Sequence, residues 1–346
     1  LGRVTDIRSF VEADSGNNTY LSIDSDLQMV TYDLLEQEIA GILYSKIQNV
    51  KTFKATTEDK IIIPIDDVYF ALVNNILKLS DFEKPEASEA EKNIYGVFAT
   101  KLNENIGWLS QKLFSEQAAK YTELNEEEKS YCDYIYKMLV GESILVSDLV
   151  DRTDSTYLAW KSEKISLREF LQHAIAKNWI DITTLNKQKD GYSDSDEIYQ
   201  SLITKISDLV KKDTQYHKLI YKYMIAKDEI TGKNLCLSLF DQDILAYNES
   251  DILSLKNGTI SAYDFIKEKI RKLEITPANL ALDPCSGSCV ITNPQTGELL
   301  ACVSYPGYDS NKLANGVDAK YFASLNRDQF TPQFNYATQQ ETAHRS

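Results

Sequence analysis

Long apolar runs are missing from this 346-residue sequence. A membrane-spanning helix needs about 20 consecutive apolar residues, whereas the best candidate run, residues 61–65, contains a proline and stops at Asp66. No signal peptide is visible either. The chain begins at Leu1 rather than at a methionine and stops at Ser346. We therefore expect a trimmed piece of a longer parent protein, about whose anchor these residues say nothing.

Basic charge is also scarce, because 37 lysines and arginines face 52 acidic residues and the formal net charge is -15. Nucleic acids are polyanions that attract basic surfaces, so this composition excludes a nucleic-acid partner. The five cysteines are too few for a disulfide framework in a chain of this length. Cys285 and Cys289 have no zinc-like spacing, and the three histidines lie far apart. We therefore expect no metal and no cofactor.

The first part of the chain predicts an extended segment followed by one helix. Residues 1–22 read as a lead-in, with a short strand over 19–23. Asp24 or Asp26 can then cap a helix that runs to about Tyr44. Apolar residues recur at helical spacing and predict one buried face, formed by Leu27, Val30, Leu34, Leu35, Ile39 and Ile42.

The middle of the chain, residues 46–285, predicts a mostly helical domain. Apolar positions at helical spacing indicate helices over 65–79, 89–114, 125–140, 166–179 and 194–227. Two helix starts resemble capping boxes, Ser166-x-x-Glu169 and Ser261-x-x-Asp264. These starts resemble each other weakly, and we identify no internal repeat.

The last part, residues 286–346, changes to strand-like sequence. Two apolar runs, 287–292 and 298–305, flank the turn residues 293–297 and predict a hairpin. Both runs are apolar on both faces, which is typical of strands covered by helices on both sides. A turn centred on Gln295 and Thr296 places Cys289 opposite Cys302. The strict geometry of disulfides favours free thiols there. We also expect the helix over 24–44 to pack on this hairpin, because neither can stand alone.

Three stretches resemble one family together. Residues 23–28 read IDSDLQ, residues 287–313 form a long hairpin-like segment, and residues 335–339 read NYATQ. They resemble, in this order, the IDxxLQ, the first hairpin and the NRATQ of penicillin-binding proteins, the peptidoglycan D,D-transpeptidases. The resemblance implies an α/β fold, a partial transpeptidase core of helix plus β-hairpin with a large, mostly α-helical insertion. Its parts would be the lead-in 1–22, the first core helix 23–45, the insertion 46–285 and the hairpin segment 286–346.

In this family a serine attacks the carbonyl between two terminal D-alanines of a stem peptide, and an amine on a neighbouring stem resolves the acyl-enzyme. The resemblance places this catalytic serine at Ser346, although His344 and Arg345 replace the expected Pro and Gly. The family's base is a lysine three residues after the serine, and no Ser-x-x-Lys occurs in this sequence. The chain is therefore expected to be inactive by itself, truncated at the catalytic serine of an active parent.

The resemblance also implies partners and a location. Peptidoglycan stem peptides and β-lactams would bind the parent, and the helical insertion would offer a surface to cell-wall synthesis or division proteins. The parent would lie on the extracytoplasmic face of the bacterial membrane, anchored by an N-terminal segment that is not in this chain. Two alternatives stay open: a non-catalytic interaction module or pseudoenzyme of the cell-wall machinery, and a β-lactam sensor or β-lactamase. The IDxxLQ-like helix and the long lead-in favour the wall enzyme over the last of these.

Overall fold

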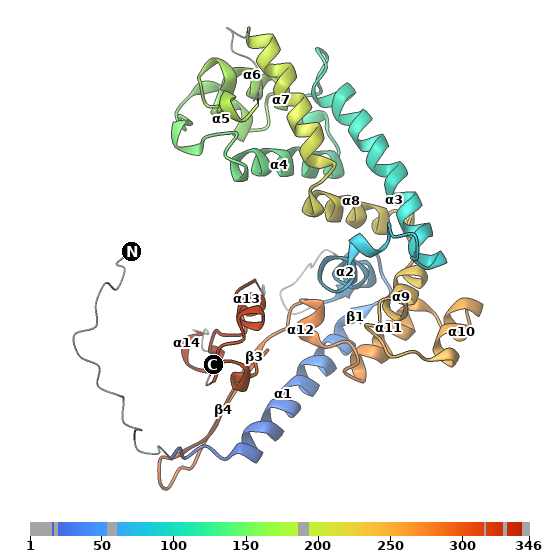
Figure 1. Ribbon diagram of the computed structural model, residues 1–346, viewed down its shortest axis with the longest axis vertical. Coiled ribbons are helices and arrows are strands. Elements are labelled where there is room, and N and C mark those ends of the chain that lie inside the picture. The colour runs from blue at the N-terminus through green and yellow to red at the C-terminus, as the bar shows by residue number, and fades with distance from the viewer. Residues whose placement is uncertain are drawn as a thin grey trace, which may run out of the picture. The chain divides into compact units, whose positions relative to one another are not determined.

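The computed structural model describes residues 16, 20–53, 61–185, 194–314, 316–327 and 331–340. The chain forms two compact units (Figure 1). Leu1–Ile39 and Pro284–Ser346 form the first, which we call the hairpin unit, and Ala40–Asp283 form the second, the helical unit. Among the described residues, no helix combines the length and the apolar character that crossing a membrane requires.

The hairpin unit is built on two antiparallel strands, β3 (Gly287–Thr292) and β4 (Leu299–Tyr305). Cys289 pairs with Val303 and Val290 with Cys302, so the predicted pairing of Cys289 with Cys302 is wrong. The cause is a bulge beside Thr292, which shifts the register by one residue. A one-residue shift reverses the face of a side chain, so the two thiols lie on opposite faces of the hairpin.

Helix α1 (Ser25–Lys46) packs on one face of this hairpin, as expected. The contact is close at Gly287, where an added Cβ atom would lie 3.2 Å from Ile39 and 3.3 Å from Leu35. The other face of the hairpin is covered only in part in the described residues: α14 contacts it near Ser304, whereas Val290 is 49% exposed. The prediction of helices covering both faces is therefore met only in part for the residues that the structure describes.

The start of α1 follows the predicted capping chemistry. The Asp24 side chain accepts hydrogen bonds from the backbone N–H groups of Asp26 and Leu27, both at 3.0 Å. The predicted buried face is only partly right: Ile39 is buried, whereas Val30 and Leu34 are half-exposed at 50% and 55%. A two-stranded sheet is narrow, so it covers one side of the helix and leaves this pair outside.

The predicted strand over 19–23 is absent from its described residues, 20–23. This segment nevertheless lies alongside the first residues of β4. Ser22 Oγ donates to the Leu299 carbonyl at 2.8 Å, and the Asp24 N–H donates to the Leu300 carbonyl at 2.9 Å. The hairpin unit also contains two short helices, α13 (Ala319–Arg327) and α14 (Tyr336–Gln339).

The helical unit is a series of helices, most of them short, with one small parallel strand pair, β1 (Ile47–Gln48) and β2 (Ile63–Pro64) (Figure 1). The helices are α2 (Ile65–Ala71), α3 (Glu89–Trp108), α4 (Glu126–Gly141), α5 (Ser155–Lys161), α6 (Leu167–Ala176), α7 (Ser195–Val210), α8 (Thr214–Ala226), α9 (Gly232–Asp241), α10 (Glu249–Asn257), α11 (Ala262–Arg271) and α12 (Pro277–Leu280). Turns of π-helix extend α2 over Leu72–Ile76 and α3 over Leu109–Leu113.

The single helix predicted over 194–227 is wrong, because the chain breaks it into α7 and α8. Asp213 stands at the break, where its carboxylate accepts hydrogen bonds from the backbone N–H groups of Gln215 and Tyr216 at 2.7 and 2.9 Å. Aspartate favours this N-cap position over a helix interior. The capping box predicted at Ser166 and Glu169 is confirmed, with both reciprocal bonds present.

Many helices of the helical unit end in the same way. At each such end one residue has left-handed backbone, with φ between 55° and 71°: Ser143, Glu163, Asn178, Asp228, Asp243, Gly258 and Leu273. In every case the next N–H donates 2.8–3.0 Å to a carbonyl one turn back, for example Glu229 to Met224 and Glu274 to Lys269. This pattern is the Schellman ending of a helix.

The repeat has a period, so the expectation of no internal repeat is wrong. Asp228, Asp243, Gly258 and Leu273 follow one another every 15 residues, as do Glu163 and Asn178. Two positions after each left-handed residue stands an isoleucine or leucine: Leu145, Ile165, Ile180, Ile230, Leu245, Ile260 and Ile275. Four of the next positions are serine or threonine caps: Ser166, Thr231, Ser261 and Thr276. Five of these seven aliphatic side chains are buried, and Ile165 and Ile260 are half-buried. Where the serine or threonine cap is present, the ending is followed directly by the start of the next helix.

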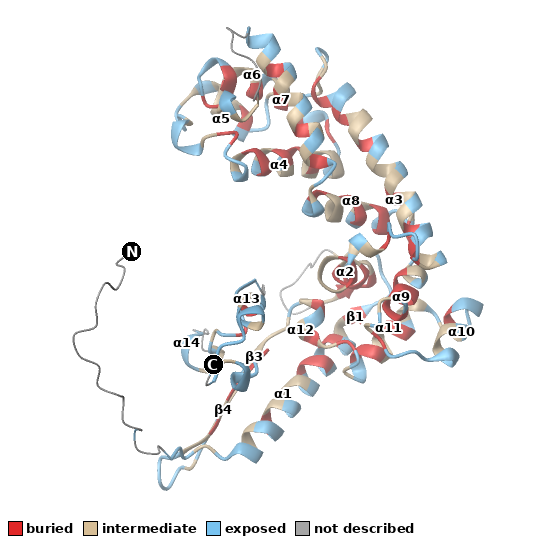
Figure 2. Cartoon of the chain, in the orientation of Figure 1, coloured by how far each residue is buried: buried red, intermediate tan, exposed pale blue. Residues whose placement is uncertain are grey.

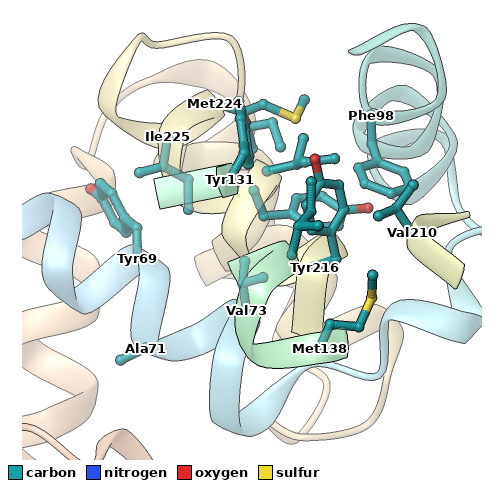
Figure 3. Packing of buried hydrophobic residues seen from close by; sticks show 14 of the residues in the cluster. Tyr69, Ala71, Val73, Phe98, Tyr131, Met138, Val210, Tyr216, Met224 and Ile225 are labelled. Carbon is teal, nitrogen blue, oxygen red and sulfur yellow. The ribbon is translucent and has the colours of Figure 1, made fainter. Parts of the chain in front are cut away.

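Buried positions recur along the helices of the helical unit (Figure 2). Aromatic side chains are prominent in its core, among them Phe98, Tyr131 and Tyr216 (Figure 3). The rings of Phe98 and Tyr221 stack at 4.5 Å and 6°, and Tyr131 lies 5.5 Å from Tyr216. The buried Tyr216 hydroxyl donates to Asn105 Oδ1 at 2.5 Å. A buried hydroxyl without such a partner would destabilise the fold, so this bond allows tyrosine to serve as a core residue.

Candidate functional site

The three stretches that resemble penicillin-binding proteins meet at one cavity of the hairpin unit. Its volume is about 660 Å³. The first stretch contributes Gln28, the second contributes Ser304 and its neighbours on β4, and the third contributes Asn335. The described part of the chain thus brings together residues up to about 300 positions apart around one hollow.

Gln28 completes the edge of strand β4. Its side-chain amide donates to the Cys302 carbonyl at 2.9 Å and accepts from the Cys302 N–H at 2.8 Å. A primary amide carries the same donor and acceptor as a peptide group, so this side chain takes the place of a neighbouring strand. Asp24, which caps the helix, and Gln28, one turn later, together set the position of α1 on β4.

Tyr32, one turn further along α1, forms the next part of the wall. Its ring lies 5.6 Å from that of Tyr305, and its hydroxyl accepts from the Gly307 N–H at 3.3 Å. A side chain at Gly307 would place its Cβ atom 3.1 Å from the Tyr32 ring, so glycine suits this close approach. Burial raises the pKa of Tyr32, and the Gly307 bond opposes this effect only in part. The hydroxyl is therefore protonated at neutral pH.

The NYATQ stretch is fixed to β4 through one serine. Ser304 Oγ donates to Asn335 Oδ1 at 3.1 Å and accepts from the Ala337 N–H at 3.3 Å. Asn335 also caps α14, because its side-chain oxygen accepts from the N–H groups of Ala337 and Thr338 at 3.0 and 3.2 Å. The short helix that precedes Ser346 along the chain is therefore held against the hairpin.

Part of the far wall of the cavity comes from α13, a helix that the sequence analysis did not predict. Tyr321, on α13, accepts the Asp309 N–H at 2.7 Å, and the Lys312 ammonium lies 4.7 Å from the centre of its ring. These contacts hold the segment after β4 in place. Asp309 lies in the resembling stretch 287–313, whereas no local motif marks Tyr321, because its pairing with Asp309 exists only in the folded unit.

The cavity has the chemistry of a polar recognition site. Among the described residues, hydroxyls and amides line it together with one carboxylate, that of Asp309, and the lining includes no lysine, arginine or histidine. A serine becomes a nucleophile only beside a base. The Ser304 hydroxyl meets the amide oxygen of Asn335, which cannot take its proton. Ser304 therefore positions α14.

The residue predicted as the nucleophile, Ser346, lies outside the described residues, as do His344 and Arg345. The described ranges contain no group of three or more histidine, cysteine or acidic side chains arranged to hold a metal ion. All five cysteines are free thiols. The described residues thus form a cavity beside α14, the helix that precedes Ser346 along the chain.

Comparison with known proteins gives one short similarity. A 50-residue stretch is 46% identical to peptidoglycan D,D-transpeptidase MrdA of Escherichia coli K12, and equally to the MrdA proteins of strains O6:H1 and O157:H7. The match covers 14% of this chain and spans 8% of the length of each relative. No family model and no solved structure matches the chain. The similarity points to the penicillin-binding proteins and extends no further than this stretch.

Proposed function

We propose that this chain is part of a serine D,D-transpeptidase that cross-links peptidoglycan stem peptides. The observation that carries the proposal is the 46% identity to MrdA over 50 residues. The geometry of the hairpin unit agrees with it, since the three resembling stretches lie around one cavity. A role in acyl transfer would follow if Ser346, seven residues beyond the end of α14, starts the helix that carries the nucleophile.

In this proposal the hairpin unit is the first part of an α/β transpeptidase core, and residues 46–285 are an insertion. Stem peptides and β-lactams would bind next to Ser346. Such an enzyme acts where peptidoglycan lies, on the extracytoplasmic face of the bacterial membrane. The cavity would hold polar groups of the substrate, because its hydroxyl and amide donors suit peptide carbonyls better than anions.

The enzyme from the complete reading frame tests the proposal. Incubated with a peptidoglycan strand that carries pentapeptide stems, it should release D-alanine and form cross-linked dimers that mass spectrometry detects. Ser346→Ala should abolish both products, whereas Ser324→Ala, at an exposed serine of α13, should keep them. Equal activity of the Ser346→Ala protein would contradict the assignment of the nucleophile.

A second candidate function is a non-catalytic interaction module of the cell-wall machinery. The observation that favours it is the 15-residue repeat of the helical unit, because tandem helical repeats present extended surfaces to protein partners. The two functions predict different behaviour of full-length Ser346→Ala in cells. A module would keep its role in wall growth with this substitution, and an enzyme would lose it.

A further inference from the structure

The helical unit contains a second cavity, of about 580 Å³, which the proposed function does not use. Three segments surround it: the turn after the π-helical end of α2, one side of α3, and the junction of α7 with α8. Its lining residues are Leu77, Lys78, Leu79, Ser80, Glu83, Tyr95, Phe98, Leu102, Lys211, Lys212, Thr214, His217, Lys218 and Tyr221. The volume is within the range of small-molecule sites.

The charge of this cavity is opposite to that of the chain. Four lysines line it against one carboxylate, that of Glu83, although the chain as a whole carries a net charge of -15. Glu83 already accepts the Tyr95 hydroxyl at 3.3 Å. Within the described ranges none of these four lysines forms an ion pair. Asp81 and Asp213 act on this region electrostatically, but neither pairs directly with these ammonium groups. The four positive charges repel one another and favour the binding of an anion.

Lys218 shows how one of these ammonium groups is held. Its Nζ donates to the Asn74 carbonyl at 2.6 Å, on the side of α2. An ammonium group has three donors, so this bond leaves two for a ligand. Burial lowers the pKa of Lys218, and an anion beside it would offset that cost. The side chain is therefore positioned by the fold before any ligand arrives.

The floor of the cavity is apolar. Phe98 stacks on Tyr221 at 4.5 Å, and the His217 ring meets Phe98 edge-on at 5.1 Å. Figure 3 shows Phe98 projecting from α3 near Val210, at the end of α7. Leu77 and Leu102 extend this surface. A cavity with both lysines and apolar residues suits a ligand that has one anionic end and one apolar end.

We propose that this cavity binds a small molecule in which two linked phosphate groups are joined to a ring or another apolar portion. The four ammonium groups match the charge of a diphosphate, and lysine binds phosphate as a point charge. The apolar portion lies against the half-buried side chains of Tyr95 and Leu102, since Phe98 and Tyr221 are themselves buried in the core. The site belongs entirely to the helical unit and does not depend on the transpeptidase activity.

Isothermal titration calorimetry on the 346-residue chain tests this site with pyrophosphate, ADP and adenosine as probes. ADP should bind, pyrophosphate should bind more weakly, and adenosine should show no measurable heat. Affinity for ADP should fall steeply with added salt, because the contacts are between charges. Absence of binding by both ADP and pyrophosphate would overturn the proposal.

Two variants with the same change in net charge complete the test. Lys211→Gln with Lys212→Gln removes two exposed ammonium groups from the cavity and should weaken ADP binding by about tenfold or more. Lys137→Gln with Lys164→Gln removes two exposed lysines elsewhere in the helical unit and should leave the affinity unchanged. Equal affinities of the two proteins would show that ADP binds somewhere else. Circular dichroism before each titration shows that both variants are folded.

Discussion

The two hydrogen bonds between Gln28 and strand β4 should stabilise the edge of this strand by an amount that can be measured. Gln28→Leu keeps the size of the side chain and removes both hydrogen bonds to Cys302, which measure 2.8 and 2.9 Å. Each bond contributes about 1 kcal/mol net, and an unpaired buried backbone group costs about 1–3 kcal/mol. Cys302 is only partly buried, so water replaces part of the loss. We expect the free energy of opening this edge to fall by about 2 kcal/mol.

Amide hydrogen exchange of β4, followed by mass spectrometry, measures this loss directly. A decrease of about 2 kcal/mol corresponds to a roughly thirtyfold faster exchange, and it should be concentrated at Cys302 and its neighbours. Gln37→Leu, at an exposed position of the same helix, is the matched control and should change exchange little. If the Gln28 and Gln37 variants exchange alike, the amide does not act as a strand partner and the reasoning fails.

Three further predictions concern the helical unit. Gly232→Ala places a Cβ atom 2.2 Å from the Tyr69 ring, so it should lower the free energy of unfolding by about 1–3 kcal/mol, which a lower thermal midpoint would show. Gly96→Ala, with nothing within 4 Å, should raise the free energy of unfolding by up to about 1 kcal/mol. Asp243→Gly relieves a left-handed φ of 55°, so it should raise the free energy of unfolding by about 0.5–1 kcal/mol, which urea titration would show as a higher midpoint. Burial lowers the pKa of His217, so the unfolded chain binds a proton at this residue more readily than the folded chain. The free energy of unfolding should therefore fall as the pH drops below about 6.5. In urea titrations at pH 5 to 7, His217→Gln should reduce the dependence of this free energy on pH.

The helix starts could be predicted because their signals are local. The Ser166 side chain bonds the Glu169 N–H three residues away, and Asp24 bonds the Leu27 N–H in the same way. Such caps depend on residue type and spacing alone. The split between α7 and α8 was missed because apolar spacing continues through it, although Asp213 is a favourable cap.

The 15-residue repeat was hidden by the residue types at its turns. Left-handed helix ends are expected at glycine, yet of the residues that carry them here only Gly258 is glycine. The aspartates, and above all Leu273, do not mark such a conformation in a sequence. The aliphatic residue two positions later was the usable signal, because it recurs at all seven endings of the pattern.

The bulge in the hairpin and the two cavities depend on tertiary contacts. Gln28 and Cys302 are 274 positions apart, so no pattern within a window reveals their bond. Likewise Lys78 and Lys211 approach one cavity only after α2, α3 and α8 have packed together. Lysine in a sequence predicts a solvated surface, and only the fold shows that several point into the same space.

Covalent labelling with a fluorescent penicillin tests the central claim, that this chain belongs to a serine D,D-transpeptidase. The protein from the complete reading frame should gain one penicilloyl group, and peptide mass spectrometry should place it on Ser346. The 346-residue polypeptide should stay unlabelled, because its sequence contains no Ser-x-x-Lys to supply the base. A complete protein that gains no label, or one labelled at a serine other than Ser346, would contradict the account.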